Sequence, residues 1–306
     1  MSIEETISRA CADVGILPPK RLAYGKWMQT DTLNGKSGKG DGRVIINEAR
    51  VTAWNWQTGE KVTIGMSDSN GDRRDRGRIA QAIQVEKHKK KERAARAADI
   101  ASRLVELAQP AQHPYLVAKG FPAESALVAD AADVRRLAGD YIVPEGARRT
   151  IIMPARIEGR ITSLQLIWEN GSKKFLAGGE IRGASHRISK GADTWLCEGF
   201  ATGLTVRAAL KALRLSATVL CCFSASNVAV VAKTIRGRCF IAADHDPVPA
   251  ENPFNGLGTG EYYSRQAGLL YGMPPDIKTD FNDMHQRHGI FAVQRVLTSI
   301  MTGRRP

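Results

Sequence analysis

The chain has 306 residues, of which 43% are hydrophobic and 25% are charged. This composition excludes a wholly disordered protein, and the length predicts about two domains. Lys and Arg number 44 against 31 Asp and Glu, which gives a formal net charge of +13. A surplus of this size favours a polyanionic partner, most simply nucleic acid, although a protein can also be basic without one.

Cysteine usage and apolar runs indicate the compartment. The five cysteines, at positions 11, 197, 221, 222 and 239, include no C-x-x-C pair, so the sequence predicts no zinc site. Most of them stand in apolar runs, which is typical of buried, reduced thiols. No apolar run approaches the roughly 18 residues of a membrane span, and the polar amino terminus is unlike a signal peptide. We therefore expect a cytoplasmic protein without a membrane partner.

The first 80 residues are predicted to form a small β-rich domain. A helical pattern over 1–17 precedes short runs at 43–47, 51–56 and 61–65, separated by Gly and Asn turns, which is typical of an antiparallel unit. Trp54 and Trp56 stand two apart on one face of a strand. That spacing favours a small core over a base-stacking platform.

A basic helix is predicted to follow this domain. Residues 67–78 are polar and turn-rich and are predicted to form a loop, and a long helix is predicted over 79–109. Between 86 and 96 this helix carries six Lys or Arg against two Glu. We assign 81–112 as a basic linker helix, whose charged face either contacts phosphates or is simply solvated.

The remainder of the chain mixes strands and helices. Residues 113–190 are predicted to form a mixed α/β subdomain, with a helical turn at 113–119 and strands at 150–156, 160–168 and 173–176, the first two joined by a tight turn at Glu158-Gly159. From 191 to 306, apolar strands at 194–199, 217–223 and 238–244 alternate with helices at 201–213, 227–234, 258–271 and 282–301. This alternation indicates a parallel α/β sheet, so the predicted fold class is α/β here and α+β overall.

Acidic residues follow the strands of this predicted sheet. Glu198 closes the first strand, Asp244 and Asp246 close the third, and Asp280 and Asp283 precede the last helix. Because ligands gather at the carboxyl ends of parallel strands, we expect these acids to converge on one edge. Crowded carboxylates repel unless a cation neutralises them, and oxygen ligands favour Mg²⁺ or Mn²⁺. Such a site supports phosphoryl transfer.

A purely structural interpretation of the same acids stays open. Asp280 stands where a helix N-cap is expected, and Asp244 and Asp246 can close a turn. The order of all three acidic groups along the chain favours the metal site over three unrelated caps.

The segments around these acids resemble a known family. Leu196-Cys-Glu-Gly-Phe-Ala-Thr-Gly-Leu204, Ala243-Asp-His-Asp246 and Asp280-Phe-Asn-Asp283 are similar to the Toprim fold of primases and topoisomerases. Further segments narrow the resemblance to Toprim-domain DNA primases of phages and plasmids; they include Trp54-Asn-Trp-Gln-Thr-Gly59 and His113-Pro-Tyr-Leu-Val-Ala-Lys-Gly120. The resemblance is strong over 194–289 and weak before residue 110.

This resemblance implies roles for the acids. Glu198 would be a metal ligand or the acid/base near the incoming 3′-hydroxyl, and Asp244 and Asp246 would hold the catalytic Mg²⁺ or Mn²⁺. Asp280, with Asp283, would support a second metal or the nucleotide phosphates. Relatives join ribonucleoside triphosphates on a single-stranded DNA template and release pyrophosphate. They act in the bacterial cytoplasm and are encoded by phages, plasmids or integrated elements.

The resemblance also implies roles for basic residues. Lys173 and Lys174 would line a groove between the 113–190 and 191–306 subdomains and contact nucleotide or template, with Arg160 and Lys119 as further candidates. The alternative is that the lysine pair is a solvated hairpin flank. Two features of relatives are missing from these 306 residues: a cysteine-rich zinc module and a helicase. We therefore expect a separate replicative helicase as partner, and domain 1–80 as a possible template-binding domain.

The sequence favours a metal-dependent primase that synthesises RNA primers. One alternative is a Toprim nuclease that cuts DNA or RNA with Mg²⁺. The other is a non-catalytic, DNA-binding replication adaptor that recruits a helicase.

Overall fold

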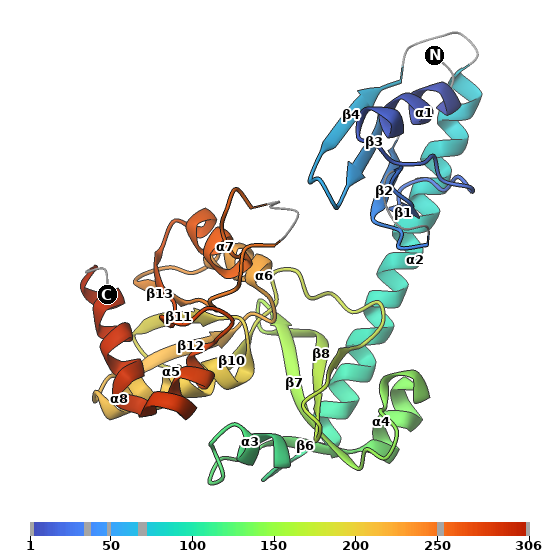
Figure 1. Ribbon diagram of the computed structural model, residues 1–306. Helices are drawn as coiled ribbons and strands as arrows, with labels where there is room; N and C mark the ends of the chain where they lie inside the picture. Colours follow the sequence, from blue (N-terminus) through green and yellow to red (C-terminus); the bar gives the residue numbers. More distant parts are fainter. Residues whose placement is uncertain (1–2, 34–37, 48–49, 67–71, 250–253, 304–306) are drawn as a thin grey trace. The chain divides into compact units, whose positions relative to one another are not determined.

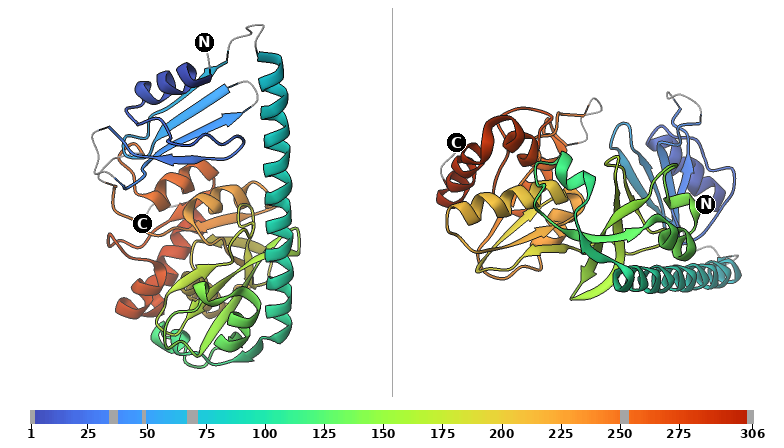
Figure 2. Two further views of the ribbon diagram at one scale, coloured as in Figure 1. Left: turned by 90° about the vertical axis from the view of Figure 1, so that its right-hand side faces the viewer. Right: turned by 90° about the horizontal axis from the view of Figure 1, so that it is seen from below.

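The computed structural model describes residues 3–33, 38–47, 50–66, 72–249 and 254–303. Contacts divide the chain into a first unit, Met1–Glu92 with Ala250–Asn255, and a second unit, Arg93–Pro249 with Gly256–Pro306. The long helix α2 (Asp72–Leu107) belongs to both units and is continuous across the boundary between them (Figure 2). None of the described helices is long and apolar enough to cross a membrane.

The first unit is a four-stranded antiparallel sheet with one packed helix. The sheet order is β1-β2-β3-β4, and its elements are α1 (Ile3–Asp13), β1 (Met28–Thr30), β2 (Gly42–Asn47), β3 (Arg50–Asn55) and β4 (Lys61–Gly65). Buried residues alternate along β2, as expected where one face of a strand meets a core. Helix α1 places Ile7, Ala10 and Cys11 in that core. The predicted helix and three strands are confirmed, and β1 is an additional strand.

The prediction that Trp54 and Trp56 form a small core is wrong. Along β3 the buried side chains are those of Val51, Thr52, Ala53 and Asn55. Trp54 is only half-buried, and Trp56 beyond the strand is 51% exposed. Their rings contact each other, with centroids 5.2 Å apart. The sheet therefore turns its aliphatic face to α1 and its aromatic face away from the core.

Helix α2 begins earlier than the sequence predicted. Residues 67–71 lie outside the described part of the chain, but 72–78 are helical rather than a loop. Arg is a strong helix former and takes four of these seven positions, which offsets the weaker Asp and Gly, so the polar composition does not prevent a helix. The helix ends at Leu107, and β5 (Gln109–Ala111) follows it, so the predicted linker helix does not extend to residue 112.

The first sheet of the second unit is antiparallel, in the order β5-β6-β7-β8-β9. Strands β7 and β8 form the predicted hairpin, and its turn residues Glu158 and Gly159 both have positive φ, which suits a tight turn. Strand β9 lies at the edge of the sheet. The elements are α3 (Pro114–Ala118), β6 (Ala126–Asp130), α4 (Ala131–Ala138), the 3₁₀ turn η1 (Asp140–Ile142), β7 (Arg149–Ile157), β8 (Arg160–Trp168) and β9 (Lys173–Phe175).

The second sheet of this unit has the order β10-β12-β11-β13-β14. Strands β11 to β14 are parallel, and the edge strand β10 is antiparallel to β12. Helix α5 packs with α8 on one face and α6 packs with α7 on the other (Figure 1). The elements are β10 (His186–Ser189), β11 (Asp193–Cys197), α5 (Phe200–Ala212), β12 (Ala217–Cys221), α6 (Ala225–Ala232), β13 (Cys239–Ala242), α7 (Thr259–Ala267), β14 (Leu270–Gly272) and α8 (Phe281–Thr302).

The predicted fold class, α/β within an α+β chain, is confirmed. The expected parallel sheet has an additional antiparallel edge strand, β10. The helix predicted over 258–271 ends earlier, because Gly268 adopts a left-handed C-cap that ends α7, and the residues at the end of the predicted range form β14. One hydrophobic cluster joins the two sheets of this unit, with Met153 of β7 and Trp195 of β11 both fully buried in it. All five cysteines are buried and free, as predicted.

Gly191 and Gly77 offer a paired test of this packing. A Cβ at Gly191 would lie 2.3 Å from the backbone of residues 216 and 217, whereas a Cβ at the helical Gly77 would meet nothing within 4 Å. We expect Gly191→Ala to lower the free energy of unfolding around β11 and β12 by about 1–3 kcal/mol. Gly77→Ala should raise local stability by up to about 1 kcal/mol, because alanine favours helix. Hydrogen exchange resolved by peptide measures both; equal effects would contradict the packing described.

Candidate functional site

The acidic residues lie where the order of strand addition changes from one side of β11 to the other in the second sheet. Strand β11 has β12 on one side and β13 on the other, so the carboxyl ends of β11 and β13 form a topological switch point. Glu198 directly follows β11, and Asp244 stands two residues after the end of β13. The sheet therefore brings these two acids to one edge, at the position where open α/β sheets bind ligands.

Glu198 is held by the turn between β12 and α6. Its carbonyl oxygen accepts the N–H of Phe223 at 2.9 Å, and its carboxylate is hydrogen-bonded by the backbone of Ala225 at the start of α6. Burial, followed by the charge of Asp246, raises the pKa of Glu198 to about 7, while the Lys173 ammonium and the Ala225 hydrogen bond oppose that rise. A carboxyl group with this pKa can exchange a proton near neutral pH.

Asp244 is the most perturbed acid of the group. Burial and then the charges of Glu198, Asp280 and Asp246 raise its pKa to about 8, and Lys173 again acts in the opposite direction. Its Oδ1 atom is buried and has no hydrogen-bond partner within the described chain. Buried polar atoms are normally paired, so this oxygen is available to a ligand.

A small cavity connects the two acids. It measures about 10 Å³ and is lined by Glu198, Asp244, Ala225, Gly260 and Ser264 among others. This volume holds about one water-sized particle. Glu198 and Asp244 therefore border the same small space.

Asp246 is fixed by the start of α7. Its Oδ2 accepts the N–H of Gly260 at 2.8 Å. A Cβ at Gly258 would lie 2.1 Å from the carbonyl oxygen of Asp246, and one at Gly260 would lie 2.3 Å from that of Asp244. Only glycine allows this approach, so the sequence of the α7 start positions both aspartates.

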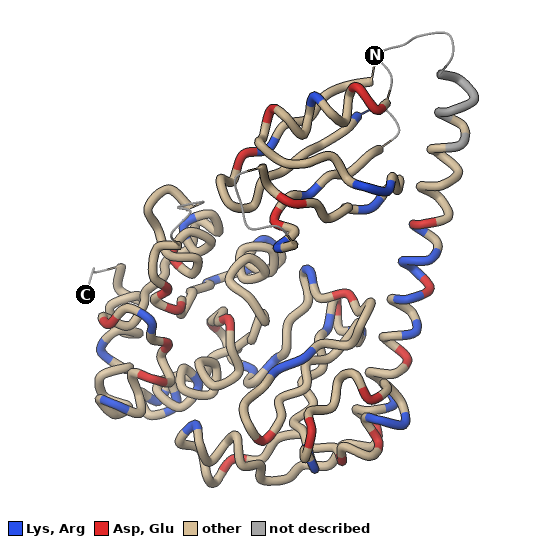
Figure 3. Tube along the Cα trace, turned by 45° about the vertical axis from the view of Figure 1, so that its right-hand side comes forward, with Lys and Arg blue, Asp and Glu red and all other residues tan. Residues whose placement is uncertain are grey.

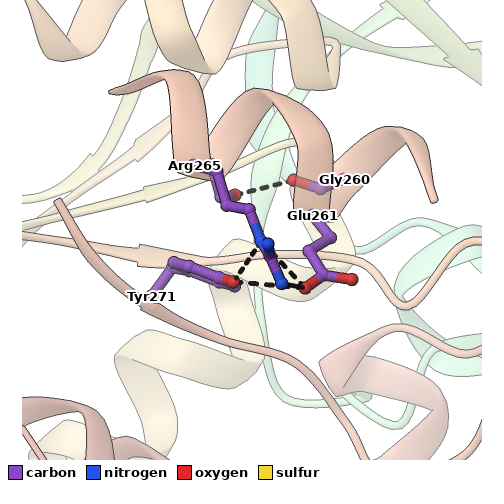
Figure 4. A network of polar contacts seen from close by, with 5 residues as sticks. Gly260, Glu261, Arg265 and Tyr271 are labelled. Atoms are coloured by element: carbon purple, nitrogen blue, oxygen red, sulfur yellow. Dashed lines mark hydrogen bonds and ion pairs between the residues drawn. The ribbon is translucent and has the colours of Figure 1, made fainter. Parts of the chain in front are cut away.

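A polar network holds α7 against β14. Arg265 donates to Glu261 at 2.6 Å and to the Tyr271 hydroxyl at 3.2 Å, and that hydroxyl also bonds Glu261 at 3.3 Å (Figure 4). Because Glu261 is the residue next to Gly260, this network steadies the turn of α7 that contacts Asp246.

Asp280 and Asp283 form a capping box at the start of α8. The Asp280 side chain accepts the N–H of Asp283 at 2.8 Å, and the Asp283 side chain accepts the N–H of Asp280 at 3.2 Å. The N-cap anticipated for Asp280 is therefore present. Asp280 also raises the pKa values of Glu198 and Asp244, so it lies within electrostatic range of both acids. Asp283 is engaged in the cap.

The two predicted lysines point to different places. Lys173 lowers the pKa values of Glu198 and Asp244, so its ammonium group lies within electrostatic range of both acids. Lys174 instead donates from Nζ to the carbonyl oxygen of Tyr141 at 3.1 Å. Adjacent residues of a strand project to opposite faces, which accounts for the difference.

The other two predicted basic residues have local contacts. Arg160 stands at the β7–β8 turn, where it is 83% exposed and pairs with Glu158 at 3.7 Å. Lys119 is the C-cap of α3, and its carbonyl oxygen accepts from Asn282 at 2.9 Å. Their proposed contacts with nucleotide or DNA remain predictions.

Three residues near the acids were not predicted from the sequence as site residues. Phe223 has a φ of 71°, a strained conformation for a residue that is not glycine, and its ring meets Phe175 edge-on at 5.6 Å. The buried Tyr115 hydroxyl has no hydrogen-bond partner in the described chain, and burial and then Asp280 raise its pKa. Asn282 is buried with its Oδ1 also unpartnered there. Tyr115 and Asn282 lie in segments that resemble Toprim primases, and that resemblance could have identified both as candidate site residues. The conformation of Phe223 has no recognisable pattern in the sequence.

The acids fit a hard divalent cation in chemistry and charge. Their oxygens are of the type that Mg²⁺ and Mn²⁺ prefer, and Asp244 has an unpartnered buried oxygen. As the side chains stand, no group of three or more His, Cys, Asp or Glu among the described residues is placed to hold a metal ion. Glu198, Asp246 and Asp280 each accept a backbone N–H. A shared coordination shell would require some of them to turn from these partners toward Asp244.

Comparisons with known proteins give only coarse similarities. No family model matches the chain. One similar structure is a chain in a bacteriophage T7 complex. In that complex the lagging-strand DNA polymerase interacts with primase domains of two gp4 subunits bound to an RNA/DNA hybrid and dTTP. The two chains are 14% identical, and the match covers 50% of this chain and 78% of that one, with a TM-score of 0.35. The primase fragment of the T7 primase-helicase protein is 14% identical over 50% and 64%, with a TM-score of 0.32. A split-gene transketolase reaches a TM-score of 0.25 at 16% identity, over 38% and 43%. TM-scores this low carry no conclusion about fold or function.

The raised pKa values predict how pH and metal act on stability. The folded chain keeps protons on Glu198 up to about pH 7 and on Asp244 up to about pH 8, whereas in the unfolded chain such groups ionise near pH 4. The folded state therefore binds more protons in this window, and the stability of the metal-free chain should fall as pH rises from about 4 to 8. Mg²⁺ or Mn²⁺ should raise the melting temperature more at pH 8 than at pH 6, because the ion needs ionised carboxylates.

Thermal unfolding in chelator and in metal, at both pH values, measures this effect. Asp244→Asn should flatten the pH dependence and reduce the metal-induced shift, whereas Glu158→Gln, an exposed acid at the β7–β8 turn, should leave both unchanged. An equal metal-induced shift in all three proteins would place the cation elsewhere.

Proposed function

We propose that the protein is a DNA primase that synthesises short RNA primers on single-stranded DNA with the help of Mg²⁺ or Mn²⁺. The observation that carries the proposal is the group of four acids around the switch point, with an unpartnered oxygen on Asp244 and the Lys173 ammonium within electrostatic range. Acids together with the ammonium group of Lys173 at one edge of a sheet suit a reaction that transfers a phosphoryl or nucleotidyl group.

Each residue has a proposed part in nucleotidyl transfer. A divalent ion held by Asp244 and Asp246 would neutralise phosphate charge and make the attacking hydroxyl more acidic. Glu198, with a pKa of about 7, accepts the proton of the 3′-hydroxyl while the oxygen of that hydroxyl bonds to the α-phosphorus of the incoming ribonucleotide. The bond to pyrophosphate breaks, and Lys173 balances the charge on the phosphates that leave.

Three features support primer synthesis over the alternatives. The segments around Glu198, Asp244 and Asp280 resemble Toprim primases. The net charge of +13 suits a nucleic-acid partner. Lys173 supplies a positive charge for triphosphates, which hydrolysis of a nucleic acid does not require. Single-stranded DNA, ribonucleoside triphosphates and a separate replicative helicase are therefore the proposed partners.

Primer synthesis can be measured directly. The full chain is incubated with single-stranded DNA, labelled ribonucleotides and Mg²⁺ or Mn²⁺, with and without a replicative helicase. Short labelled RNA is the expected product. Glu198→Gln and Asp244→Asn should each reduce its formation at least about 10²-fold, because each removes a charged group from the reacting centre. Glu158→Gln should keep full activity.

Other products would point to other functions. Degradation of the template without synthesis would indicate the nuclease. Template binding without either product, in both the presence and absence of helicase, would indicate the adaptor and contradict the primase proposal.

The lysine pair provides a second, matched test. Lys173→Met should slow synthesis at saturating template by about 10²-fold, because the charge facing the acids and phosphates is lost. Lys174→Met should leave that rate unchanged, since its Nζ bonds to Tyr141 instead. Steady-state kinetics with varied ribonucleotide concentration distinguish the two. Equal loss in both variants would contradict the assignment of Lys173 to the reacting phosphates.

A further inference from the structure

A positively charged site, distinct from the group of acids, lies in the other half of the same unit. A cavity of about 400 Å³ is bounded by the second half of α2, by α4 and by the turn that follows β9. Four arginines line it, Arg93 and Arg96 from α2 and Arg135 and Arg136 from α4, together with Tyr141 of η1. Lys and Arg recur along α2 and stand again in α4 (Figure 3). The acids of the switch point do not line this cavity.

The cavity is built by close backbone packing. Arg93 and Arg96 stand three apart in α2, so they share one face of the helix. The turn after β9 approaches that face at Gly178, where φ is 79° and an added Cβ would lie 3.0 Å from the Cβ of Arg93. The Tyr141 hydroxyl accepts the N–H of Ala177 in the same turn at 3.2 Å. These contacts hold the turn after β9 against α2 and fix the position of Tyr141.

The charge of the cavity is only weakly balanced. No Asp or Glu is among the described residues that line it. Arg135 pairs with Asp140 at 3.1 Å and Arg136 with Asp133, and the side chains of these two pairs are between 32% and 88% exposed to solvent. Exposed ion pairs of this kind contribute about 0–1 kcal/mol, so a polyanion can displace the acids.

Tyr141 adds an aromatic surface to this positive site. The residue is 59% exposed although its hydroxyl and carbonyl groups are both engaged, by Ala177 and Lys174. An exposed ring held in place beside guanidinium groups suits a nucleobase stacked next to its own phosphates.

Strand β9 links this cavity with the acidic site. It is the edge strand of its sheet, so a bound chain can cross it without passing through the fold. Its Lys173 lies within electrostatic range of the acids, whereas Lys174 bonds to Tyr141. Leu176 and Ala177, in the turn after β9, line the arginine cavity. Strand β9 and the turn after it therefore contribute residues near both sites.

We propose that the arginine cavity binds the phosphodiester backbone of single-stranded nucleic acid, with a base stacked on Tyr141, and leads the strand over β9 toward the acids. The direction toward the acids rests on the proposed primase function. The binding itself does not, because it requires neither metal nor triphosphate.

Binding is measured on the full chain with a fluorescent oligothymidylate of about 20 nucleotides, by anisotropy in chelator at several salt concentrations. Arg93→Gln/Arg96→Gln should weaken binding about tenfold at moderate salt and reduce the slope of log K against log salt by about 1.4, since each phosphate contact to a single strand contributes about 0.7. Tyr141→Leu should weaken binding about tenfold with little change in slope. Arg103→Gln, on α2 outside the cavity, should match wild type.

Each alternative result has a definite meaning. If Arg93→Gln/Arg96→Gln binds like Arg103→Gln, the proposal is overturned. If a duplex of equal length binds as tightly and Tyr141→Leu has no effect, the cavity is a general phosphate contact and the single-strand proposal is also overturned. Glu198→Gln should bind like wild type, so a failed primase assay with intact, arginine-dependent binding would reject the proposed reaction and keep the binding site.

Discussion

The burial of two carboxyl groups, Glu198 and Asp244, beside further acids at the end of the second sheet is the constraint on which the site depends. Glu198, Asp246 and Asp280 all raise the pKa of Asp244, in addition to the larger effect of burial. At roughly 1.4 kcal/mol for each tenfold change in proton affinity, ionising such groups in place costs the folded chain several kcal/mol. Protonation removes this cost near pH 6, and positive charge removes it at higher pH. Lys173 supplies part of that charge, and a divalent cation would supply the remainder.

The surrounding backbone keeps the acids together despite this repulsion. Gly258 and Gly260 let the start of α7 press against the carbonyl oxygens of Asp246 and Asp244, at distances that any larger residue would prevent. The strained Phe223 directs its N–H to the carbonyl oxygen of Glu198. Positions fixed by backbone contacts do not relax when charge develops nearby, which is the property that electrostatic catalysis requires. Backbone contacts therefore hold the acids close together, although their charges repel one another.

Sequence patterns predicted the sheet and the acid positions because both follow from strand order. Glu198 and Asp244 could be placed at one edge once apolar strands were seen to alternate with helices. Lys173 and Lys174 could not be separated, because the face that each occupies depends on where a three-residue strand begins. Asp283 looked like a ligand because a capping acid and a ligand acid have the same sequence signature. The arginine cavity was invisible in sequence, since α2, α4 and the turn after β9 meet only in the folded unit.

The central claim is that the acids at the switch point bind one divalent cation as a group. Crystals grown with Mn²⁺ at about pH 8, where Glu198 is largely ionised and Asp244 is at the midpoint of its titration, test it through the anomalous scattering of manganese. We expect a manganese peak in contact with the carboxylate of Asp244 and shared with Glu198 or Asp246, which disappears in Asp244→Asn. Manganese bound only elsewhere on the chain, or no peak at the acids at saturating Mn²⁺, would contradict it.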